Sequence, residues 1–367
     1  MLGMNRFGMV ALLLIGAASS PLPAGAADAV SAVETASATP FDERLDAAFA
    51  ELRQKKISSI AAIAHRNQPI VVREFAAADQ DGIPPGTTQV DINSITKTVT
   101  GAMTLKLVEQ GQLRLNERLA EIFSDVPADK ANITVRHLLT HAAGFVESVG
   151  TDEERLNKRD FLRRAFQSPL RSTPGVRYHY SNVGFSVLAA IIEERSGKSY
   201  DDYLRQDVIA HLGLGNTGYM SVYDDARSLR SHRGETVMTA SWGGHKPFWN
   251  LIGNGGLIST AKDFIRFRQA FVAGEIVAPE LVRDAQRKHI AENPEGTSHY
   301  GYGLVVLDHE ELGRIYWHDG GNDIFSAIWF DLVDQGDIIF TAAADSRAGD
   351  ATEVLRVLVK HLYGVEL

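Results

Sequence analysis

The sequence predicts an α+β fold in which helices flank an antiparallel sheet and a mainly helical domain is inserted between the parts of the sheet. Runs rich in β-formers lie near both ends of the chain, and helical patterns dominate its middle. The first and the last strands of such a chain can pair with each other in one antiparallel sheet. We therefore expect a sheet domain from residues 41–78 and 296–367, and a mainly helical domain from residues 79–295.

The composition is that of a globular protein. The chain has 367 residues, of which 44% are hydrophobic and 23% are charged, which excludes a disordered, collagen-like or polytopic membrane protein. Its 37 basic and 46 acidic residues give a net charge of −9, which argues against a nucleic-acid partner. The absence of cysteine excludes disulfides, thiolate nucleophiles and zinc–thiolate sites.

The first 26 residues have the three parts of a secretory signal peptide. A positive charge at Arg6 precedes an apolar run over residues 7–18, and small residues around Ala26 provide a cleavage site. The run is shorter than the ~20 apolar residues that a membrane-spanning helix needs. The alternative interpretation is a membrane anchor that is not cleaved. We expect a linker over residues 27–40, no membrane span in the mature chain, and a periplasmic or secreted protein.

The elements expected in the sheet domain come from both ends of the chain. An amphipathic helix is predicted over residues 42–56, and β-rich runs at 57–64 and 69–75 predict a hairpin. The end of the chain returns to strand patterns and closes with a helix. These final elements are expected at 302–308, 314–318, 325–332, 337–344 and 351–362.

Helical signals fill the middle of the chain. The first helix is expected from Ser94 to Glu109, with Gly111 as its stop signal. The remaining helical patterns cover 135–141, 158–166, 186–195, 201–208 and 261–272.

Several hydrolase motifs are absent or have a structural explanation. No Gly-x-Ser-x-Gly occurs, which excludes the nucleophile elbow of α/β-hydrolases. His137 and His141 lack the intervening glutamate of a zinc-protease helix, so we interpret both as structural. A Ser-x-x-Lys match that begins at Ser259 overlaps a capping box at Thr260, which opens a helix.

The first Ser-x-x-Lys match along the chain, Ser94 to Lys97, suits nucleophilic catalysis. Asn93 is a favourable helix cap, which places Ser94 at a helix start, where free N–H groups favour an oxyanion. Lys97 follows one turn later on the same face. A serine hydroxyl needs a base to become nucleophilic, and burial can keep a lysine neutral enough to act as one. An exposed serine beside a solvated lysine is the alternative.

Tyr180-Ser181-Asn182 is the only Tyr-x-Asn in the chain and supplies two further candidates. A phenol beside an ammonium group can be held as phenolate, which makes Tyr180 a candidate acid/base. Asn182 could hydrogen-bond both Lys97 and a substrate amide.

The segment His318-Asp319-Gly320-Gly321 follows a strand-like run. Its small glycines would let a substrate lie along the strand edge, and the N–H of Gly321 could complete an oxyanion hole.

In this order the motifs resemble those of serine hydrolases of the class C β-lactamase, D,D-peptidase and esterase type, over roughly residues 41–363. The resemblance implies a β-lactamase/transpeptidase-like fold with the site between the two domains. It implies Ser94 as the acyl-enzyme nucleophile, and Lys97 with Tyr180 as the proton-transfer pair. In the same way, Asn182, His318, Gly320 and Gly321 would bind substrate, with the N–H groups of Ser94 and Gly321 as the oxyanion hole. It implies no cofactor or metal.

The third motif departs from that of true β-lactamases, which carry Lys-Thr-Gly where this chain has His318-Asp319-Gly320. A mostly neutral imidazole and an acid replace an ammonium and a hydroxyl. We therefore expect an exported hydrolase whose small-molecule substrate is a carboxylic ester or a D-amino-acid peptide. A class C-like β-lactamase, an acyltransferase and a catalytically silent cell-wall-binding homologue stay open, and the oligomeric state is unknown.

Overall fold

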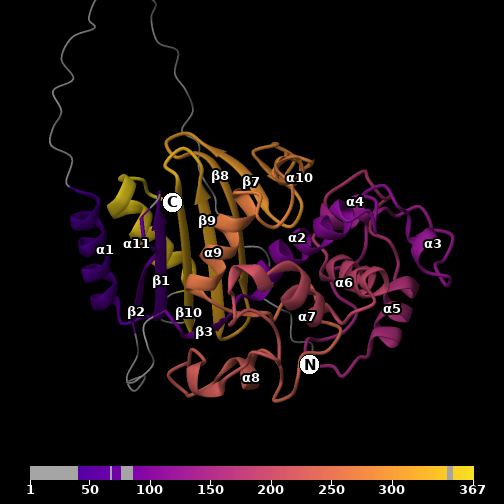
Figure 1. Cartoon of the computed structure of the whole chain (residues 1–367), viewed down its shortest axis with the longest axis horizontal. Helices are drawn as coiled ribbons and strands as arrows, with labels where there is room; N and C mark the ends of the chain where they lie inside the picture. The colour runs from indigo at the N-terminus through magenta and orange to yellow at the C-terminus, as the bar shows by residue number, and fades with distance from the viewer. Residues whose placement is uncertain (1–39, 67, 76–85, 345–349) are drawn as a thin grey trace, which may run out of the picture.

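An eight-stranded antiparallel sheet organises the protein. The computed structural model describes residues 40–66, 68–75, 86–344 and 350–367 (Figure 1). The strand order is β2-β1-β10-β9-β8-β7-β6-β5. The strands are β1 (Ser58–His65), β2 (Val71–Phe75), β5 (Ile290–Ala291), β6 (Ser298–Tyr300), β7 (Val305–His309), β8 (Gly313–Gly321), β9 (Phe325–Leu332) and β10 (Asp337–Ala344). Strand β1 pairs with β10 along its whole length, so the two ends of the chain meet as predicted.

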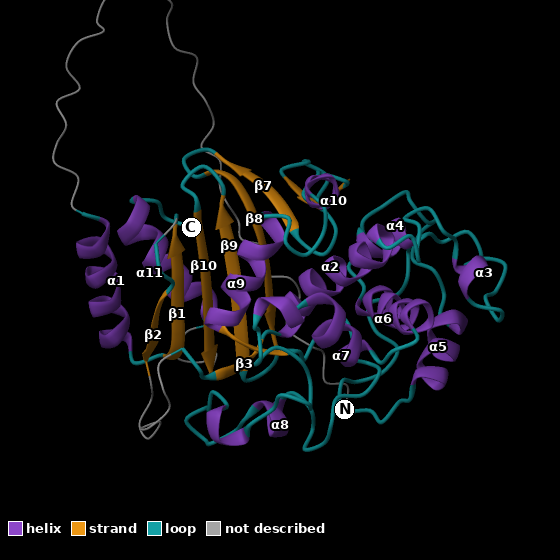
Figure 2. Cartoon of the chain, viewed as in Figure 1, coloured by secondary structure: helices purple, strands orange, loops and turns teal. Residues whose placement is uncertain are grey.

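Both faces of the sheet are covered by helices, which explains why its central strands are apolar throughout. Helices α1 (Phe41–Lys55) and α11 (Ala351–Tyr363) pack together on one face, and α9 (Ala261–Val272) crosses the other (Figure 2). Alternate residues of β10 therefore enter different cores. Ile339 lies in the core beneath α1 and α11, while Phe340 lies in the core beneath α9.

The helical region is built around two central helices, α2 (Thr96–Glu109) and α6 (Asn182–Ser196). Every residue from Thr96 to Leu105 in α2 and from Val183 to Ile192 in α6 is buried. Helices that are buried on all sides belong to the interior of a fold. Helices α4 (Val135–Leu139), α5 (Lys158–Gln167) and α7 (Tyr200–Tyr203) pack against α6, and α10 (Pro279–Ala285) packs against α2. Two further short helices are α3 (Leu119–Ile122) and α8 (Val237–Ala240).

A small second sheet connects the two parts of the protein. Strand β3 (Gln89–Asp91) leads toward α2 and pairs with β4 (Ile258–Thr260), which leads into α9. The expected boundary at residue 296 stays a prediction. Helix α9 and strand β5 precede that boundary, yet both belong to the sheet layer.

The expected signal peptide and linker lie outside the described residues, apart from Pro40, which directly precedes α1. Within the described ranges, no helix combines the length and the apolarity that crossing a membrane requires.

Candidate active site

Ser94 lies in a tight turn between β3 and α2. Residues Asn93–Ile95 form a 3-10 turn, which continues directly into α2. Asn93 has a positive φ of 48°, and its backbone N–H donates to Asp91 Oδ1 at 2.6 Å. The expected capping role of Asn93 is wrong, because its side chain makes no cap and the Asp91 carboxylate organises the turn instead. Ser94 itself is half-buried.

Lys97 is fully buried one turn beyond the serine. Its Nζ donates to Ser94 Oγ at 3.0 Å and to the Asn254 carbonyl at 2.7 Å. Burial lowers the pKa of Lys97 to about 7, although the negative charges of Asp152 and Asp319 oppose the shift. A lysine with this pKa is a neutral amine in a substantial fraction of molecules at neutral pH. The amine can therefore act as a base toward Ser94.

The carbonyl that holds Lys97 comes from a loop with a fixed backbone. The Asn254 side chain donates to Ser186 Oγ at 2.8 Å and to the Asn250 carbonyl at 2.6 Å. Gly253 has a φ of 82°, and a Cβ there would lie 2.5 Å from the Cβ of Ala189. The sequence did not identify Asn254 as a site residue, because the group that acts is a backbone carbonyl.

Tyr180 places its ring beside the lysine. Lys97 Nζ lies 4.7 Å from the centroid of the Tyr180 ring. Burial raises the pKa of Tyr180 above its usual range, and a hydrogen bond with Ser94 acts in the opposite direction. The phenol, rather than the phenolate that the sequence analysis considered possible, is therefore the favoured form at neutral pH.

His141 supports this tyrosine, in agreement with its structural interpretation. Its ring centroid lies 4.5 Å from that of Tyr180, and its Nδ1 accepts from the Ser181 N–H at 3.0 Å. Burial lowers the pKa of His141 well below its usual range, so the imidazole is neutral. His137 likewise serves its own helix, because its Nδ1 accepts from the Thr134 N–H at 3.2 Å.

Asn182 begins α6 but does not hold Lys97. The two hydrogen bonds of the lysine go to Ser94 and Asn254, so the Asn254 carbonyl takes the place expected for Asn182. Among the described residues the buried Oδ1 of Asn182 has no hydrogen-bond partner. A buried amide oxygen without a partner can accept a hydrogen bond from a substrate N–H.

The end of β8 offers a strand edge beside the serine. Strand β7 pairs with residues 313–317 of β8, whereas β9 pairs on to Gly321. Within the described part of the sheet, residues 318–321 are therefore paired on one side only. Gly320 allows the close approach, because a Cβ there would lie 2.3 Å from the Ser94 nitrogen. The proposed oxyanion hole of the Ser94 and Gly321 N–H groups stays a prediction.

His318 is buried behind this edge with both ring nitrogens engaged. Nε2 lies 2.9 Å from the Tyr300 hydroxyl, and Nδ1 lies 2.6 Å from the Asp319 carbonyl. Burial, assisted by the charge of Lys97, lowers the pKa of His318 to about 3. The imidazole therefore brings no positive charge to the site.

The charge around Ser94 is instead negative. Burial raises the pKa of the half-buried Asp319 to about 6, so this carboxyl group is mostly ionised at pH 7. Asp152 and Glu147 also act on Lys97 through their negative charges. Ser94 consequently faces an environment that favours neutral or cationic groups over anions.

The second Ser-x-x-Lys match is structural, as interpreted from the sequence. Ser259 is fully buried and lies 2.9 Å, Oγ to Oγ1, from Thr217. Thr260 caps α9, because its Oγ1 accepts from the Asp263 N–H at 3.1 Å.

Known proteins share this fold over most of the chain. The penicillin-binding protein from Bacillus halodurans superposes with a TM-score of 0.70 at 22% identity, covering 85% of this chain and 99% of that one. The D-amino acid amidase from Ochrobactrum anthropi SV3 gives a TM-score of 0.74 at 20% identity, covering 88% and 98%. The predicted fold class is therefore confirmed.

Sequence comparison leads to the same group. D-alanyl-D-alanine-carboxypeptidase/endopeptidase AmpH of Escherichia coli strain K12 is 26% identical over 239 residues, covering 62% of this chain and 60% of AmpH. The chain spans less than two thirds of the length of this and the other curated relatives it first matches. The family model described as Beta-lactamase matches residues 45–359. The resemblance stated from the motifs is confirmed, and the chain belongs to the beta-lactamase family of serine hydrolases.

Proposed function

We propose that the protein is an exported hydrolase that cleaves esters or amides through an acyl-enzyme on Ser94. The observation that carries this proposal is the 3.0 Å hydrogen bond between Ser94 Oγ and Lys97, a buried lysine whose pKa lies at about 7. A nucleophile in hydrogen-bond contact with a base of this pKa is the arrangement that covalent catalysis requires at neutral pH.

The reaction follows from the contacts around the serine. Neutral Lys97 takes the proton of Ser94 Oγ as this oxygen attacks the substrate carbonyl. The N–H groups of Ser94 and Gly321 stabilise the developing oxyanion. The phenol of Tyr180, which hydrogen-bonds with Ser94, protonates the leaving group and regains a proton from the Lys97 ammonium. A water molecule then cleaves the acyl-enzyme with the same groups in reverse order.

The preferred substrates are neutral or carry a free amine rather than a carboxylate. A substrate carboxylate a few Å from Asp319 is repelled by about 1 kcal/mol in water and by several times more where water is excluded. His318 does not compensate, since its pKa of about 3 keeps it neutral. The name of the D-amino acid amidase with the same fold supports an amide bearing a free amine, such as a D-amino acid amide.

The name of AmpH favours a second candidate, a D-alanyl-D-alanine carboxypeptidase, whose substrate ends in a carboxylate. Turnover of D-alanine p-nitroanilide, of the neutral p-nitrophenyl acetate and of diacetyl-lysyl-D-alanyl-D-alanine separates the two. We expect the first two to exceed the third in kcat/KM. We expect Asp319→Asn to shift the ratio toward the tripeptide by about ten-fold, which is ~1.4 kcal/mol.

Two outcomes would contradict this substrate assignment. One is a wild-type enzyme that prefers the tripeptide or a chromogenic cephalosporin over every neutral ester. The other is an Asp319→Asn variant in which the ratio of kcat/KM for the tripeptide to kcat/KM for the other two substrates is the same as in the wild type. Asp323→Asn, which changes a carboxylate in the turn after β8, is the matched control for net charge.

Hydrolysis and acyl transfer share the same acyl-enzyme and differ in the group that accepts the acyl chain. Product analysis with increasing glycerol or glycinamide distinguishes them. We expect the free acid as the main product at moderate acceptor concentrations, and a dominant ester or amide would identify an acyltransferase. Failure of a fluorophosphonate to label the protein would favour the catalytically silent homologue.

Export is tested separately. Expression of the full chain in a bacterium with a secretion pathway should give a mature protein that begins at Ala27, within a residue, because Ala26 ends the small-residue cleavage pattern. N-terminal sequencing reads this directly. A chain that keeps Met1 and sediments with membranes would support the anchor alternative.

A further inference from the structure

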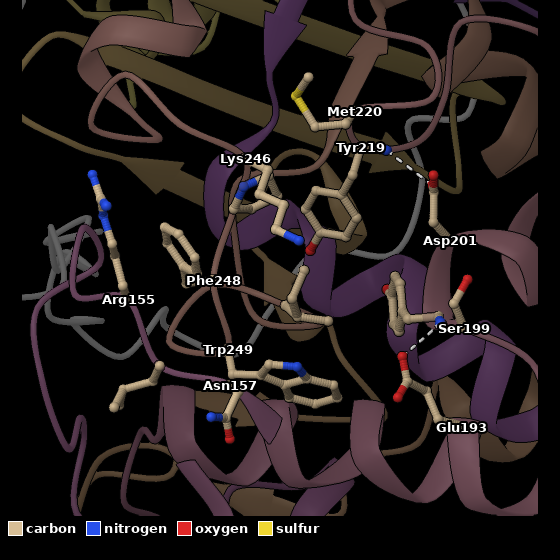
Figure 3. A pocket seen from close by; sticks show the side chains of 14 residues that line it. Arg155, Asn157, Glu193, Ser199, Asp201, Tyr219, Met220, Lys246, Phe248 and Trp249 are labelled. Carbon is tan, nitrogen blue, oxygen red and sulfur yellow. Dashed lines mark hydrogen bonds between the residues drawn. The ribbon is translucent and has the colours of Figure 1, made fainter. Parts of the chain in front are cut away.

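A cavity whose lining does not include Ser94 lies at the junction of α6 and α7 with the segment 246–252. It has a volume of about 410 Å³, within the size range of small-molecule sites. Glu193, which lines it, lies eleven residues beyond Asn182 on α6, which is about 16 Å along the helix. Figure 3 shows the cavity. Its apolar walls include Tyr200, Tyr219, Met220 and Trp249.

The charges around the cavity differ in whether they are already paired. Glu193 accepts from the Tyr200 N–H at 3.0 Å and forms an ion pair with Lys158 at 3.0 Å. Asp201 accepts from the Tyr219 N–H at 2.9 Å and from the Ser221 hydroxyl. Both acids are thus held by the protein itself.

Lys246 is the cation that lacks such a partner. Its ammonium points into the cavity beside Tyr219 (Figure 3), and no carboxylate of the described residues forms an ion pair with it. Arg155, the other cation that lines the cavity, points away in Figure 3 and contacts His245. An aromatic-walled cavity with one unpaired ammonium is complementary to an apolar group that carries a negative charge.

We propose that this cavity is a second ligand site, which binds a small organic carboxylate with an aromatic group. The aromatic group lies among Tyr200, Tyr219 and Trp249, and the carboxylate pairs with Lys246. The site is separate from Ser94 and does not depend on the hydrolase activity proposed above.

The inner wall of the cavity is hydrogen-bonded to the loop that holds Lys97. The Tyr219 hydroxyl accepts from the Gly253 N–H at 3.0 Å and donates to the Gly255 carbonyl at 2.9 Å. These residues flank Asn254, whose carbonyl holds Lys97. Tyr200 reaches the same loop through Thr100, which donates to the Gly253 carbonyl at 2.6 Å. A ligand packed against Tyr219 therefore acts on the loop that positions the base.

Calorimetry of the purified protein with three matched molecules tests the site. We expect 4-phenylbutyrate to bind about 5-fold more tightly than 4-phenylbutanol, the gain of a partly exposed ion pair. We expect 4-phenylbutylamine to bind more weakly than both. Lys246→Met should abolish the preference for the carboxylate, and Lys246→Arg should keep it. Lys262→Met, at an exposed lysine of α9, is the control and should leave all three affinities unchanged.

Two further measurements place the binding. Met220→Trp, at a 43% exposed position on the cavity rim, should weaken the binding of all three molecules. Binding should persist in Ser94→Ala, which separates this site from the proposed active site even if Ser94 proves unreactive. Equal affinities of the three molecules in the wild type, no measurable binding, or binding that disappears in Ser94→Ala would each overturn the proposal.

The coupling to Lys97 has its own readout. Saturating 4-phenylbutyrate should change the rate of fluorophosphonate labelling of the wild type by at least ~2-fold, which is ~0.4 kcal/mol. The change should be absent in Met220→Trp. An unchanged rate in a wild type that demonstrably binds 4-phenylbutyrate would refute the coupling.

Discussion

The reactivity of Lys97 is set by its burial more than by any single neighbour. In the unfolded chain its pKa is near 10.5, and burial lowers this pKa to about 7 in the folded protein. The protonated lysine cannot accept the serine proton. Activity should therefore be absent well below pH 7 and should rise as the pH passes through about 7.

This pH dependence is a direct prediction for kcat/KM with a neutral ester. The rising limb should have its midpoint near pH 7, because kcat/KM reports the free enzyme. Lys97→Arg should be inactive across the whole range, since a guanidinium does not lose its proton. A profile of the wild type that stays flat from pH 5 to 9 would mean that another group is the base.

Ser94 should carry the acyl group. We expect Ser94→Ala to lower kcat by at least ~10³, in line with the cost of removing a serine nucleophile elsewhere. Mass spectrometry of fluorophosphonate-treated wild type should find the adduct on the peptide that contains Ser94. Ser259→Ala is the matched control and should keep full labelling, because Ser259 is buried in the second Ser-x-x-Lys segment. An adduct on Ser259 would reassign the nucleophile.

Candidate catalytic side chains could be identified from the sequence, whereas backbone groups could not. Ser94, Lys97 and Tyr180 stand out by residue type and spacing, and the structure brings them together. The Asn254 carbonyl gives no such signal, since every residue has a carbonyl. The capping role expected for Asn93 was wrong, because the competing carboxylate of Asp91 lies two residues earlier.

At the scale of elements, the approach of β8 to the 3-10 turn decides whether the site can form. The strand edge and the turn touch at Gly320, where a Cβ would lie 2.3 Å from the Ser94 nitrogen and 2.7 Å from the Asn93 Cβ. A backbone atom cannot move aside as a flexible side chain can. Any side chain at this position must therefore separate the strand from the serine.

A pair of glycine variants tests this approach. Gly320→Ala should lower kcat/KM by about 10²-fold or more, because small displacements of catalytic groups have large effects. Gly321→Ala should be mild, since its new Cβ would lie 3.4 Å from the nearest atom, the Phe325 carbonyl oxygen. Both variants should keep the far-UV circular dichroism of the wild type. Equal loss of activity in the two variants would show that the close contact between Gly320 and Ser94 does not determine the activity.

The elements best predicted from the sequence are those with long apolar runs. Strands β9 and β10 begin and end where they were expected, because both faces are buried and turns bound the runs. Strands β3, β4, β5 and β6 were not predicted, since two or three residues are too few to show a period. Strand β7 starts later than expected, at Val305, because Gly303 turns with a φ of 77° against α2.

At the scale of the whole molecule, the N-terminal hairpin depends on the C-terminal strand. Strand β1 pairs with β2 on one side and with β10 on the other. The core beneath α1 is shared with α11, so the N-terminal helix also relies on the last one. A two-stranded hairpin without this support is marginal in water.

A truncation after Leu332 should therefore prevent folding, even though it spares every candidate catalytic residue. We expect this fragment to be insoluble, or to lack a cooperative thermal transition by circular dichroism. A chain that starts at Pro40 is the control and should keep the wild-type transition, because it retains α1 and every strand. A soluble, cooperatively folding fragment would show that β10 is dispensable.

The pairing of β1 with β10 also has a consequence in time. His65 and Asp337 are partners across the two strands although they are 272 positions apart in the sequence. At roughly 5–20 residues per second, a ribosome that has made His65 needs roughly 14–54 s more to reach Asp337. Throughout that interval the hairpin has an unpaired edge and the nascent chain has no complete core. A protein built in this way cannot complete its sheet until synthesis is nearly over, because β10 is among the last segments of the chain to be made.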